Sequence, residues 1–223
     1  MRLLDLFCCA GGAGAGYAAA GFEVVGVDID PQPRYPFTFL QADAIEFVAA
    51  HGHEFDAIHA SPPCQAFSKT KTLHANAHPD LIEPTRAALR ATGKPYVIEN
   101  VVGAPLIDPI KLDGRQFAMT APDVDGVLLK LVRPRLFESN LDLTAPATMT
   151  ANAHLFTASA YGAGGGWTPR HRDNPDRRGG YIPHIDVLKE LLGIDWMTKH
   201  ELSQSIPPRF TEYLGRQMMD ALS

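Results

Sequence analysis

Residues 3–28 read "LLDLFCCAGGAGAGYAAAGFEVVGVD". The apolar run Leu3–Phe7 stops at a glycine-rich turn, Ala13–Ala20 then has the composition of a helix, and Glu23–Asp28 that of a second strand. Glycines between a strand and a helix let a ligand approach the backbone and the helix N-terminus. This order of elements predicts a βαβ unit, which is the building block of a mostly parallel sheet.

The same alternation continues along the chain. Further helices are predicted over Ala42–Ala50, Pro79–Ala91, His184–Leu192 and Pro208–Leu222. Further strands are predicted over Phe55–Ala60 and Pro95–Ile98, with a later strand over Gly126–Glu138 that ends in basic residues. The predicted fold class is therefore α/β: a doubly wound, Rossmann-like sheet with a small irregular insert, because 140–183 has weak periodicity.

The overall composition is that of an ordinary globular chain of 223 residues, with 45% hydrophobic and 20% charged residues. No apolar run approaches the roughly 20 residues that span a bilayer. Asp5 and the glycine cluster interrupt the N-terminal stretch where a signal peptide needs a continuous apolar region. Three cysteines, two of them adjacent, make a poor disulfide framework. A cytoplasmic protein without membrane contact is predicted, and its oligomeric state does not follow from the sequence.

Two acids follow predicted elements near the glycine turn. Asp28 ends the second strand, where a carboxylate can accept both hydroxyls of a ribose. Asp43 follows a third short segment and is placed to accept from an exocyclic amine. Such glycines also serve tight strand–helix packing, and Asp28 could instead cap the next segment. The pattern favours a nucleoside-bearing cofactor without establishing whether that cofactor carries phosphates.

A thiol and a glutamate follow two other predicted strands. In "HASPPCQAFSK", residues 59–69, two prolines stiffen the chain just before Cys64. Either Cys64 is a positioned nucleophile, or it is a small residue in a tight turn. Glu99, in "VIENV", could hold or donate a proton to a substrate ring nitrogen, or it could pair with a lysine or cap a turn.

Zinc chemistry is excluded by the cysteine pattern. Cys64 is followed by Gln65, Ala66 and Phe67, so the second cysteine of a P-C-x-x-C zinc deaminase element is absent from the sequence. The adjacent residues Cys8 and Cys9 do not easily point at one ion. We therefore predict no metal.

Charge is unevenly distributed along the chain. Residues 1–129 carry 15 acidic and 9 basic residues, whereas residues 130–223 carry 10 and 11. Within the second part, residues 167–180, "WTPRHRDNPDRRGG", hold four arginines against two aspartates. This run is either a solvated loop or a surface that contacts nucleic acid.

Together, seven segments resemble the cytosine-5 DNA methyltransferases, and they occur in the order of that family. They cover residues 1–139 and 196–223, roughly three quarters of the chain. The segments are "DLFCCAGGAGAGYAAAGF", "VDID", "QADA", "SPPCQAFS", "VIENV", "LVRPRLFES" and "LSQSIPPRFTEYLG". Amino-methylating relatives carry an aromatic residue at the position of Cys64, so the thiol indicates methylation of carbon.

The resemblance implies a role for each matching residue. Cys64 corresponds to the nucleophile that adds to C6 of cytosine, Glu99 to the acid at N3, and Arg135, with its neighbour Arg133, to the arginine at the base carbonyl. The residues implied to bind S-adenosylmethionine are Phe7, Gly11, Gly12, Asp28, Ile29, Asp43, Pro63 and Ser205. The residues implied to contact nucleic acid are Gln65, Ser68, Arg170, Arg172, Arg177 and Arg178.

The chain departs from the family pattern at three small positions and in its size. Cys9 replaces a glycine, Leu131 replaces a glutamine, and Ser203–Gln204 replaces a Gly-Asn pair. The region expected to recognise the target, residues 140–195, is short for that purpose. We predict a catalytic and cofactor-binding unit over 1–139, this recognition region, and a return to the first unit over 196–223.

The predicted activity is methyl transfer from S-adenosylmethionine to C5 of cytosine, with double-stranded DNA as the favoured substrate. A tRNA cytosine, single-stranded DNA and a free nucleotide are alternatives. A non-catalytic nucleic-acid-binding protein is an alternative from another class, although Cys64, Glu99 and Arg135 are all retained.

Overall fold

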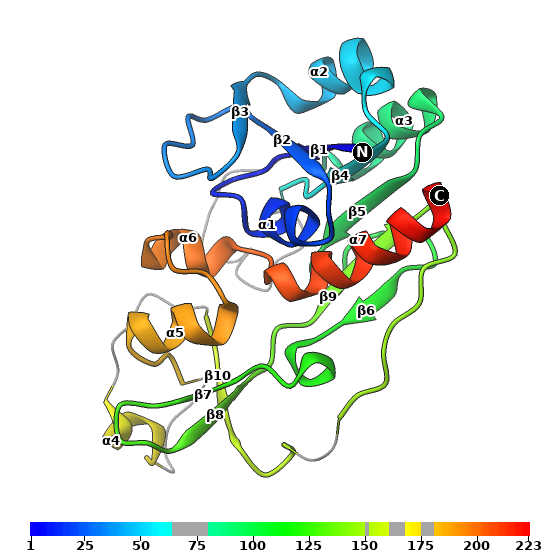
Figure 1. Ribbon diagram of the computed structural model, residues 1–223. Helices are drawn as coiled ribbons and strands as arrows, with labels where there is room; N and C mark the ends of the chain where they lie inside the picture. The colour runs from blue at the N-terminus through cyan, green and yellow to red at the C-terminus, as the bar shows by residue number, and fades with distance from the viewer. Residues whose placement is uncertain (64–79, 150–151, 161–167, 175–180) are drawn as a thin grey trace.

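The computed structural model describes residues 1–63, 80–149, 152–160, 168–174 and 181–223. Its main sheet has seven strands in the order β3-β2-β1-β4-β5-β9-β6 (Figure 1). These strands are β1 (Arg2–Leu6), β2 (Glu23–Asp28), β3 (Thr38–Gln41), β4 (Ala57–Ala60), β5 (Tyr96–Asn100), β6 (Ile110–Leu112) and β9 (Arg135–Ser139). The strands from β3 to β5 pair in parallel, while β9 is antiparallel to both β5 and β6.

Helices cover both faces of this sheet, which confirms the predicted doubly wound α/β class. Figure 1 shows α1 and α7 together against one face, with α2 and α3 at the upper end of the molecule. The helices are α1 (Gly12–Ala19), α2 (Ala44–His51), α3 (Ile82–Thr92), α4 (Pro169–Arg172), α5 (Ile185–Leu192), α6 (Lys199–Gln204) and α7 (Pro208–Leu222). Short 3-10 helices occupy Gly52–Glu54 and Gly114–Phe117.

Alternation along the strands divides the core into two clusters. Leu3 of β1 and Val97 of β5 belong to the cluster that includes residues of α1 and α7. Leu4 and Ile98, the next residues along the same strands, belong to the cluster with α2 and α3. Because successive strand side chains point to opposite faces, one apolar run supplies both cores.

Helix α1 lies close against α7 because Gly16 leaves room for it. A Cβ at Gly16 would stand 2.1 Å from both the Pro208 carbonyl oxygen and Thr211 Oγ1. Thr211 Oγ1 instead donates to the Ala13 carbonyl at 2.8 Å. The C-terminal helix is therefore tied to the helix that follows the glycine turn.

Ionisable and polar side chains gather on the α1 face of the sheet. Asp5 stands opposite His59 in the β1–β4 register, and His59 stands opposite Val97 in the β4–β5 register. Ser61 and Glu99 lie two residues further along their chains and so share that face. The sheet thus brings several polar groups together at the carboxyl end of its parallel strands, where open α/β sheets bind ligands.

A second sheet of three strands has the order β10-β8-β7. These strands are β7 (Thr120–Pro122), β8 (Leu128–Leu131) and β10 (Phe156–Ala158). The prediction of one strand over Gly126–Glu138 is wrong, because β8 and β9 belong to different sheets. Between them lies Pro134, which has no N–H to give to a continuous ladder. The small sheet takes β7 and β8 from before residue 140 and β10 from after it.

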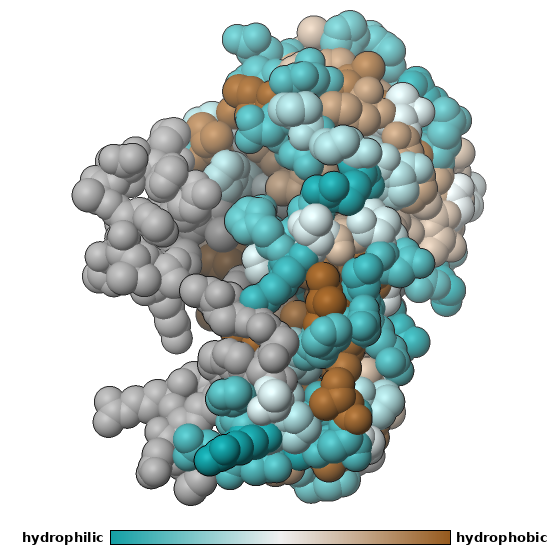
Figure 2. All heavy atoms as spheres, turned by 90° about the vertical axis from the view of Figure 1, so that its left-hand side faces the viewer, coloured by the Kyte–Doolittle hydropathy of each residue, from teal (hydrophilic) through white to brown (hydrophobic). Residues whose placement is uncertain are grey.

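The described surface is mixed in character. Hydrophilic and hydrophobic residues alternate over the coloured part of the face in Figure 2. Within the described ranges, no helix combines the length and apolar character that crossing a membrane requires.

Candidate active site

The glycine turn after β1 is built from left-handed backbone. Phe7, Cys9 and Gly11 have φ angles of 55°, 44° and 84°. Cys9 is a strained choice at such a position, since residues with a Cβ adopt left-handed conformations at a cost of about 1 kcal/mol. The departure from glycine noted in the sequence thus falls at a position where glycine would be free of strain. The Cys9 amide donates to Asp28 Oδ2 at 2.9 Å, which ties the turn to β2.

The two glycines after Cys9 allow close contacts that a side chain would prevent. A Cβ at Gly11 would stand 2.7 Å from the Pro36 ring, and one at Gly12 would stand 2.6 Å from the Ile206 carbonyl oxygen. The second contact comes from the C-terminal segment. Trp196 Nε1 also donates to the Ala10 carbonyl at 2.8 Å. The C-terminal segment therefore closes over the glycine turn.

Several residues predicted to bind the cofactor lie at the carboxyl ends of the neighbouring strands β1, β2 and β3. Asp28 is 8% exposed, and beside it the Ile29 side chain is 65% exposed. Half-buried Phe7 supplies a second apolar surface. Asp28 accepts one amide on each carboxylate oxygen and keeps lone pairs for ribose hydroxyls. Exposed Asp43 uses Oδ1 to cap α2, accepting the amides of residues 45 and 46.

Ser205 and Arg133 connect the C-terminal segment to the catalytic side. Arg133 is 1% exposed, and its Nη2 donates to the Ser203 and Ser205 carbonyls at 2.8 and 2.6 Å. The Ser205 hydroxyl is itself used, since it donates to the Leu202 carbonyl at 3.0 Å. Arg133 therefore holds the segment that also contacts the glycine turn.

Glu99 and Arg135 form a buried ion pair at the carboxyl edge of the parallel strands. Glu99 Oε1 and Arg135 Nε are 2.9 Å apart, and both side chains are nearly buried. They meet because β9 is antiparallel to β5, so the beginning of β9 lies where β5 ends. Burial raises the pKa of Glu99, while Arg135, Arg133 and a hydrogen bond from Ser61 act against this. A glutamate in these surroundings is suited to hold a proton.

The segment that leads to the predicted nucleophile ends beside Glu99. Asn100, the next residue of β5, donates from Nδ2 to the Pro62 carbonyl at 2.9 Å. Pro62 is buried and Pro63 is exposed. Cys64, Gln65, Ser68, Arg177 and Arg178 lie outside the described residues. Their predicted roles remain predictions.

The other two cysteines are poor nucleophiles. Burial, followed by the charges of Asp5 and Asp28, raises the pKa of Cys8 far above the ordinary thiol value. Desolvation, followed by the same two carboxylates, raises the pKa of Cys9 to about 12. Because the thiolate is the reactive form, neither thiol is activated near neutral pH.

Arg172 is not the exposed cation that its place in the arginine-rich run suggested. Its guanidinium donates to Asp123 at 2.9 Å and to Asp125 at 2.9 and 2.8 Å, and its Nε donates to Asp173 at 2.8 Å. The Arg172 side chain is 3% exposed. It joins α4 to the turn between β7 and β8.

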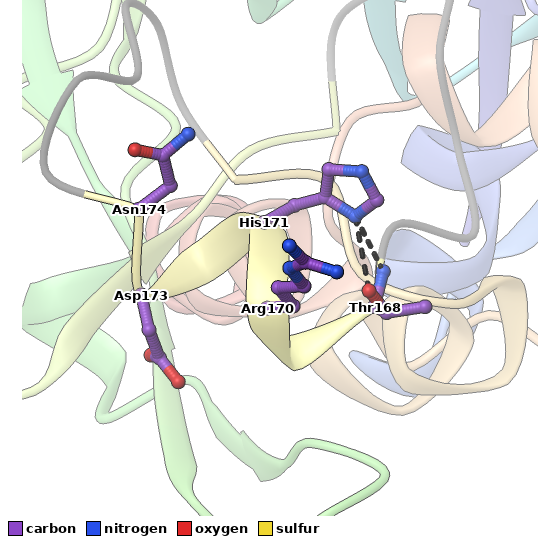
Figure 3. Close-up of a pocket in the computed structure, with 5 residues that line it drawn as sticks. All are labelled: Thr168, Arg170, His171, Asp173 and Asn174. Carbon is purple, nitrogen blue, oxygen red and sulfur yellow. Dashed lines mark hydrogen bonds between the residues drawn. The ribbon is translucent and has the colours of Figure 1, made fainter.

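Arg170, on the same short helix, is exposed. Figure 3 shows it in a pocket whose lining also includes Thr168, His171, Asp173 and Asn174. In this pocket the Thr168 backbone amide donates to His171 Nδ1 at 3.1 Å. Of the two described arginines in the run, Arg170 is the one available for an external contact.

Three buried polar groups were missed in the sequence, namely Asp5, Tyr17 and His59. Asp5 and His59 are 0% exposed within otherwise apolar strands, and Tyr17 Oη lies 3.0 Å from His59 Nδ1. An ionisable residue inside an apolar run was the available signal, because full burial of such a group requires partners.

The burial of Asp5 should make the free energy of unfolding depend on pH. The Tyr35 hydroxyl donates to its Oδ2 at 3.0 Å, yet burial raises the pKa of Asp5 to about 8. The folded chain therefore keeps this proton up to about pH 8, whereas the unfolded chain releases it near the ordinary value of 3.8. Between these values the folded state binds more protons, so stability falls as pH rises.

Asp5→Asn should remove this slope. Between pH 5 and 8, the unfolding free energy of the unsubstituted protein should fall relative to the variant by about 1 kcal/mol per pH unit. Urea unfolding at several pH values measures this, with exposed Asp220→Asn as the matched control. Parallel curves for the unsubstituted and Asp5→Asn proteins would contradict a raised pKa at this site.

The N-terminal part of the chain is similar to known methyltransferases. Residues 1–103 match the family described as C-5 cytosine-specific DNA methylase. The type II methyltransferase M.AgeI of Thalassovita gelatinovora is 31% identical over 122 residues, which are 46% of this chain and 28% of that protein. The chain thus aligns with little more than a quarter of that relative's length.

Two solved structures have the same fold. An E. coli prophage protein described as a DNA modification methyltransferase aligns with a TM-score of 0.60 and 17% identity. S. pombe Dnmt2 methyltransferase aligns with a TM-score of 0.60 and 13% identity. Each alignment covers 100% of this chain and 99% of the other. The glycine turn, the Pro-Pro segment and the glutamate of β5 all lie inside residues 1–103, the part of the chain that matches the C-5 cytosine-specific DNA methylase family.

Proposed function

We propose that the protein transfers a methyl group from S-adenosylmethionine to C5 of cytosine in DNA, with Cys64 as the nucleophile. The observation that carries this proposal is the buried Glu99–Arg135 pair, 2.9 Å across, beside the Pro62–Pro63 exit of β4. The pair offers a fixed cation and a carboxyl group whose pKa is raised by burial, beside the two prolines that precede Cys64 in the sequence. The match of residues 1–103 to the C-5 cytosine-specific DNA methylase family supports the reaction type.

The residues divide the chemistry as follows. C5 of cytosine is a weak nucleophile until the Cys64 thiolate adds to C6, which moves the electron pair of the C5–C6 double bond towards C5. Glu99 donates to N3 and stabilises the negative charge that develops in the ring, and Arg135 stabilises charge at the carbonyl oxygen. After C5 has gained its methyl group, a base removes the C5 proton, the double bond reforms and Cys64 leaves as the thiolate.

The cofactor supplies a methyl group on a sulfonium, which is a strong electrophile. In this proposal Asp28 binds its ribose, Phe7 and Ile29 contact its adenine, and Asp43 accepts from the adenine amine. Gly11 and Gly12 leave the backbone open beside the methionine portion. The exposed apolar side chain next to a nearly buried carboxylate supports this assignment.

In duplex DNA the target carbon is buried in the base stack, so the base must be flipped out at a cost of a few kcal/mol. Arg170, Arg177 and Arg178 are proposed to bind phosphates near the site, which positions the duplex without reading its sequence. Arg172 is omitted from this set because its guanidinium is committed to three aspartates.

Replacing Arg170, Arg177 and Arg178 by glutamine should therefore weaken DNA binding in a salt-dependent way. Each lost phosphate contact lowers the slope of log K against log salt by about 0.9, so the triple variant should lose up to about 3. Fluorescence anisotropy at several salt concentrations measures the slope, and Arg216→Gln, at an exposed position of α7, is the control. An unchanged slope would remove these arginines from the interface.

The proposed activity is tested by giving the protein labelled S-adenosylmethionine with duplex DNA, single-stranded DNA, tRNA or dCMP. Label on C5 of cytosine in the duplex supports the proposal. Label only in tRNA, single strands or dCMP would replace the substrate and keep the chemistry. Cofactor binding without transfer to any substrate would favour a non-catalytic nucleic-acid-binding protein.

A further inference from the structure

We propose that Tyr17 and His59 are positioning residues that fix the direction of the Ser61 hydroxyl and aim its hydrogen at the Glu99 carboxyl. The importance of Glu99 in this proposal rests on the proposed function. The direction of the hydrogen bonds does not, and it can be measured separately.

The four residues form a continuous series across the α1 face of the sheet. Tyr17 Oη of α1 lies 3.0 Å from His59 Nδ1, and His59 Nε2 lies 2.8 Å from Ser61 Oγ. The Tyr17 and His59 rings also pack against each other, with centroids 5.2 Å apart. Ser61 is in turn hydrogen-bonded to Glu99. A path of side chains therefore runs from the helix after the glycine turn to the acid at the catalytic edge.

The proton count selects one direction along this path. Burial lowers the pKa of His59 to about 3, so the ring is neutral and carries a single N–H. Tyr17 keeps its proton, since burial raises its pKa well above the ordinary value. If Ser61 donates to Glu99, its oxygen is free to accept from His59 Nε2–H. His59 Nδ1 then accepts from the Tyr17 hydroxyl.

The opposite tautomer breaks this match. With the proton on Nδ1, His59 would donate to Tyr17 and Nε2 would take the hydrogen of Ser61. Glu99 would lose its donor, and the buried Tyr17 hydroxyl would need another acceptor. Because a buried donor without an acceptor destabilises the folded state, the Nε2–H tautomer is favoured.

The charged surroundings of His59 do not oppose this assignment. On β1 its neighbour in the register is Asp5, which burial keeps protonated up to about pH 8. On β5 its neighbour is the apolar Val97. From α1 it meets Tyr17, and Glu99 is reached through Ser61. The groups that contact His59 from β1, β5 and α1 are thus neutral at pH 7.

The arrangement has a consequence for Glu99. The Ser61 hydrogen bond lowers the pKa of Glu99 and opposes the effect of burial. Loss of a fixed Ser61 donor should therefore raise the pKa of Glu99. A hydrogen bond to a charged acceptor changes an equilibrium constant by about tenfold, which corresponds to a pKa shift of about one unit.

The first test measures the tautomer directly. Long-range ¹H–¹⁵N spectra of the histidine side chains should show His59 protonated on Nε2 from pH 5 to 8, with the signal identified by its loss in His59→Gln. Tyr17→Phe, which removes only the hydroxyl, should populate the Nδ1–H form. A wild-type His59 on Nδ1, or one that titrates near pH 6.5, would overturn the proposal.

The second test follows Glu99 by ¹³C carboxyl titration and by the pH profile of methyl transfer. In His59→Leu the Glu99 titration, and the kinetic limb that Glu99→Gln removes, should move up by about one pH unit. His59→Gln keeps an N–H near Ser61, so the Glu99 pKa in this variant should return most of the way to that of the unsubstituted protein. An unchanged Glu99 titration in both His59→Leu and Tyr17→Phe would overturn the proposal. Absence of methyl transfer by the unsubstituted protein would instead count against the proposed function, and the two spectroscopic titrations would still decide the hydrogen-bond direction.

Discussion

Glu99→Gln is expected to lower the rate of methyl transfer by about 10²–10³-fold while leaving cofactor affinity within about twofold. Removal of a single preorganised group that stabilises developing charge has effects of this size. Glutamine preserves the shape of the side chain but has no proton of the required acidity for N3. It also leaves Arg135 without the carboxylate that lies 2.9 Å from its Nε.

The measurement is single-turnover transfer of labelled methyl, with cofactor affinity from calorimetry and folding from thermal melts. Glu212→Gln, on α7, is a matched control because Glu212 forms its ion pair with the exposed Arg216 at the protein surface. If Glu99→Gln transferred methyl within threefold of the unsubstituted rate, the assignment of Glu99 as the acid would be wrong.

Arg172→Met is expected to lower the free energy of unfolding by about 3–5 kcal/mol, or to unfold the small sheet separately. Removal of one member of a buried ion pair leaves the other charge without compensation. Here the stranded charge is Asp123, whose side chain is 0% exposed. The Arg172 guanidinium carbon also lies 5.2 Å from the centroid of the Phe156 ring of β10. The substitution therefore affects α4, the turn between β7 and β8, and β10.

Arg216→Met makes the same chemical change in the exposed pair with Glu212 and should cost less than about 1 kcal/mol. Urea unfolding followed by circular dichroism compares the two variants. Adding Asp123→Asn to Arg172→Met should recover part of the loss because it removes the stranded charge. Equal stability of Arg172→Met and Arg216→Met would show that the aspartate cluster does not hold the small sheet.

Much of the main sheet could be predicted from the sequence because its strands are buried on both faces. Such strands read as short continuous apolar runs, and the predicted strand Glu23–Asp28 agrees with β2 at both ends. The predicted helix Pro208–Leu222 likewise agrees with α7 at both ends. Strand β3 was not predicted because its residues are mostly exposed and lack that signal. The split between β8 and β9 was missed because apolar residues occur on both sides of Pro134, which alone marks the break.

The places of Asp28 and Glu99 at the carboxyl ends of β2 and β5 could be predicted, because each follows a short apolar run in the sequence. The surroundings of a residue could not be predicted where they depend on segments that are distant in the sequence. Arg170 and Arg172 are the same residue type two positions apart. The turn after β7 nevertheless surrounds Arg172 with aspartates, whereas Arg170 is exposed. The proposed division of the chain at residues 139 and 195 remains a prediction, as do the roles of Cys64 and its neighbours.

The central claim is that the thiol of Cys64 bonds to C6 of the target cytosine. A duplex that carries 5-fluorocytosine tests it, because fluorine at C5 cannot be removed as a proton and the adduct should persist. With S-adenosylmethionine present, we expect a complex stable to denaturing gels, with the DNA attached to the peptide that contains Cys64. Cys64→Ala should form none, while Cys9→Ala should form as much as the unsubstituted protein. Methyl transfer by Cys64→Ala, or an adduct on any other residue, would contradict the account.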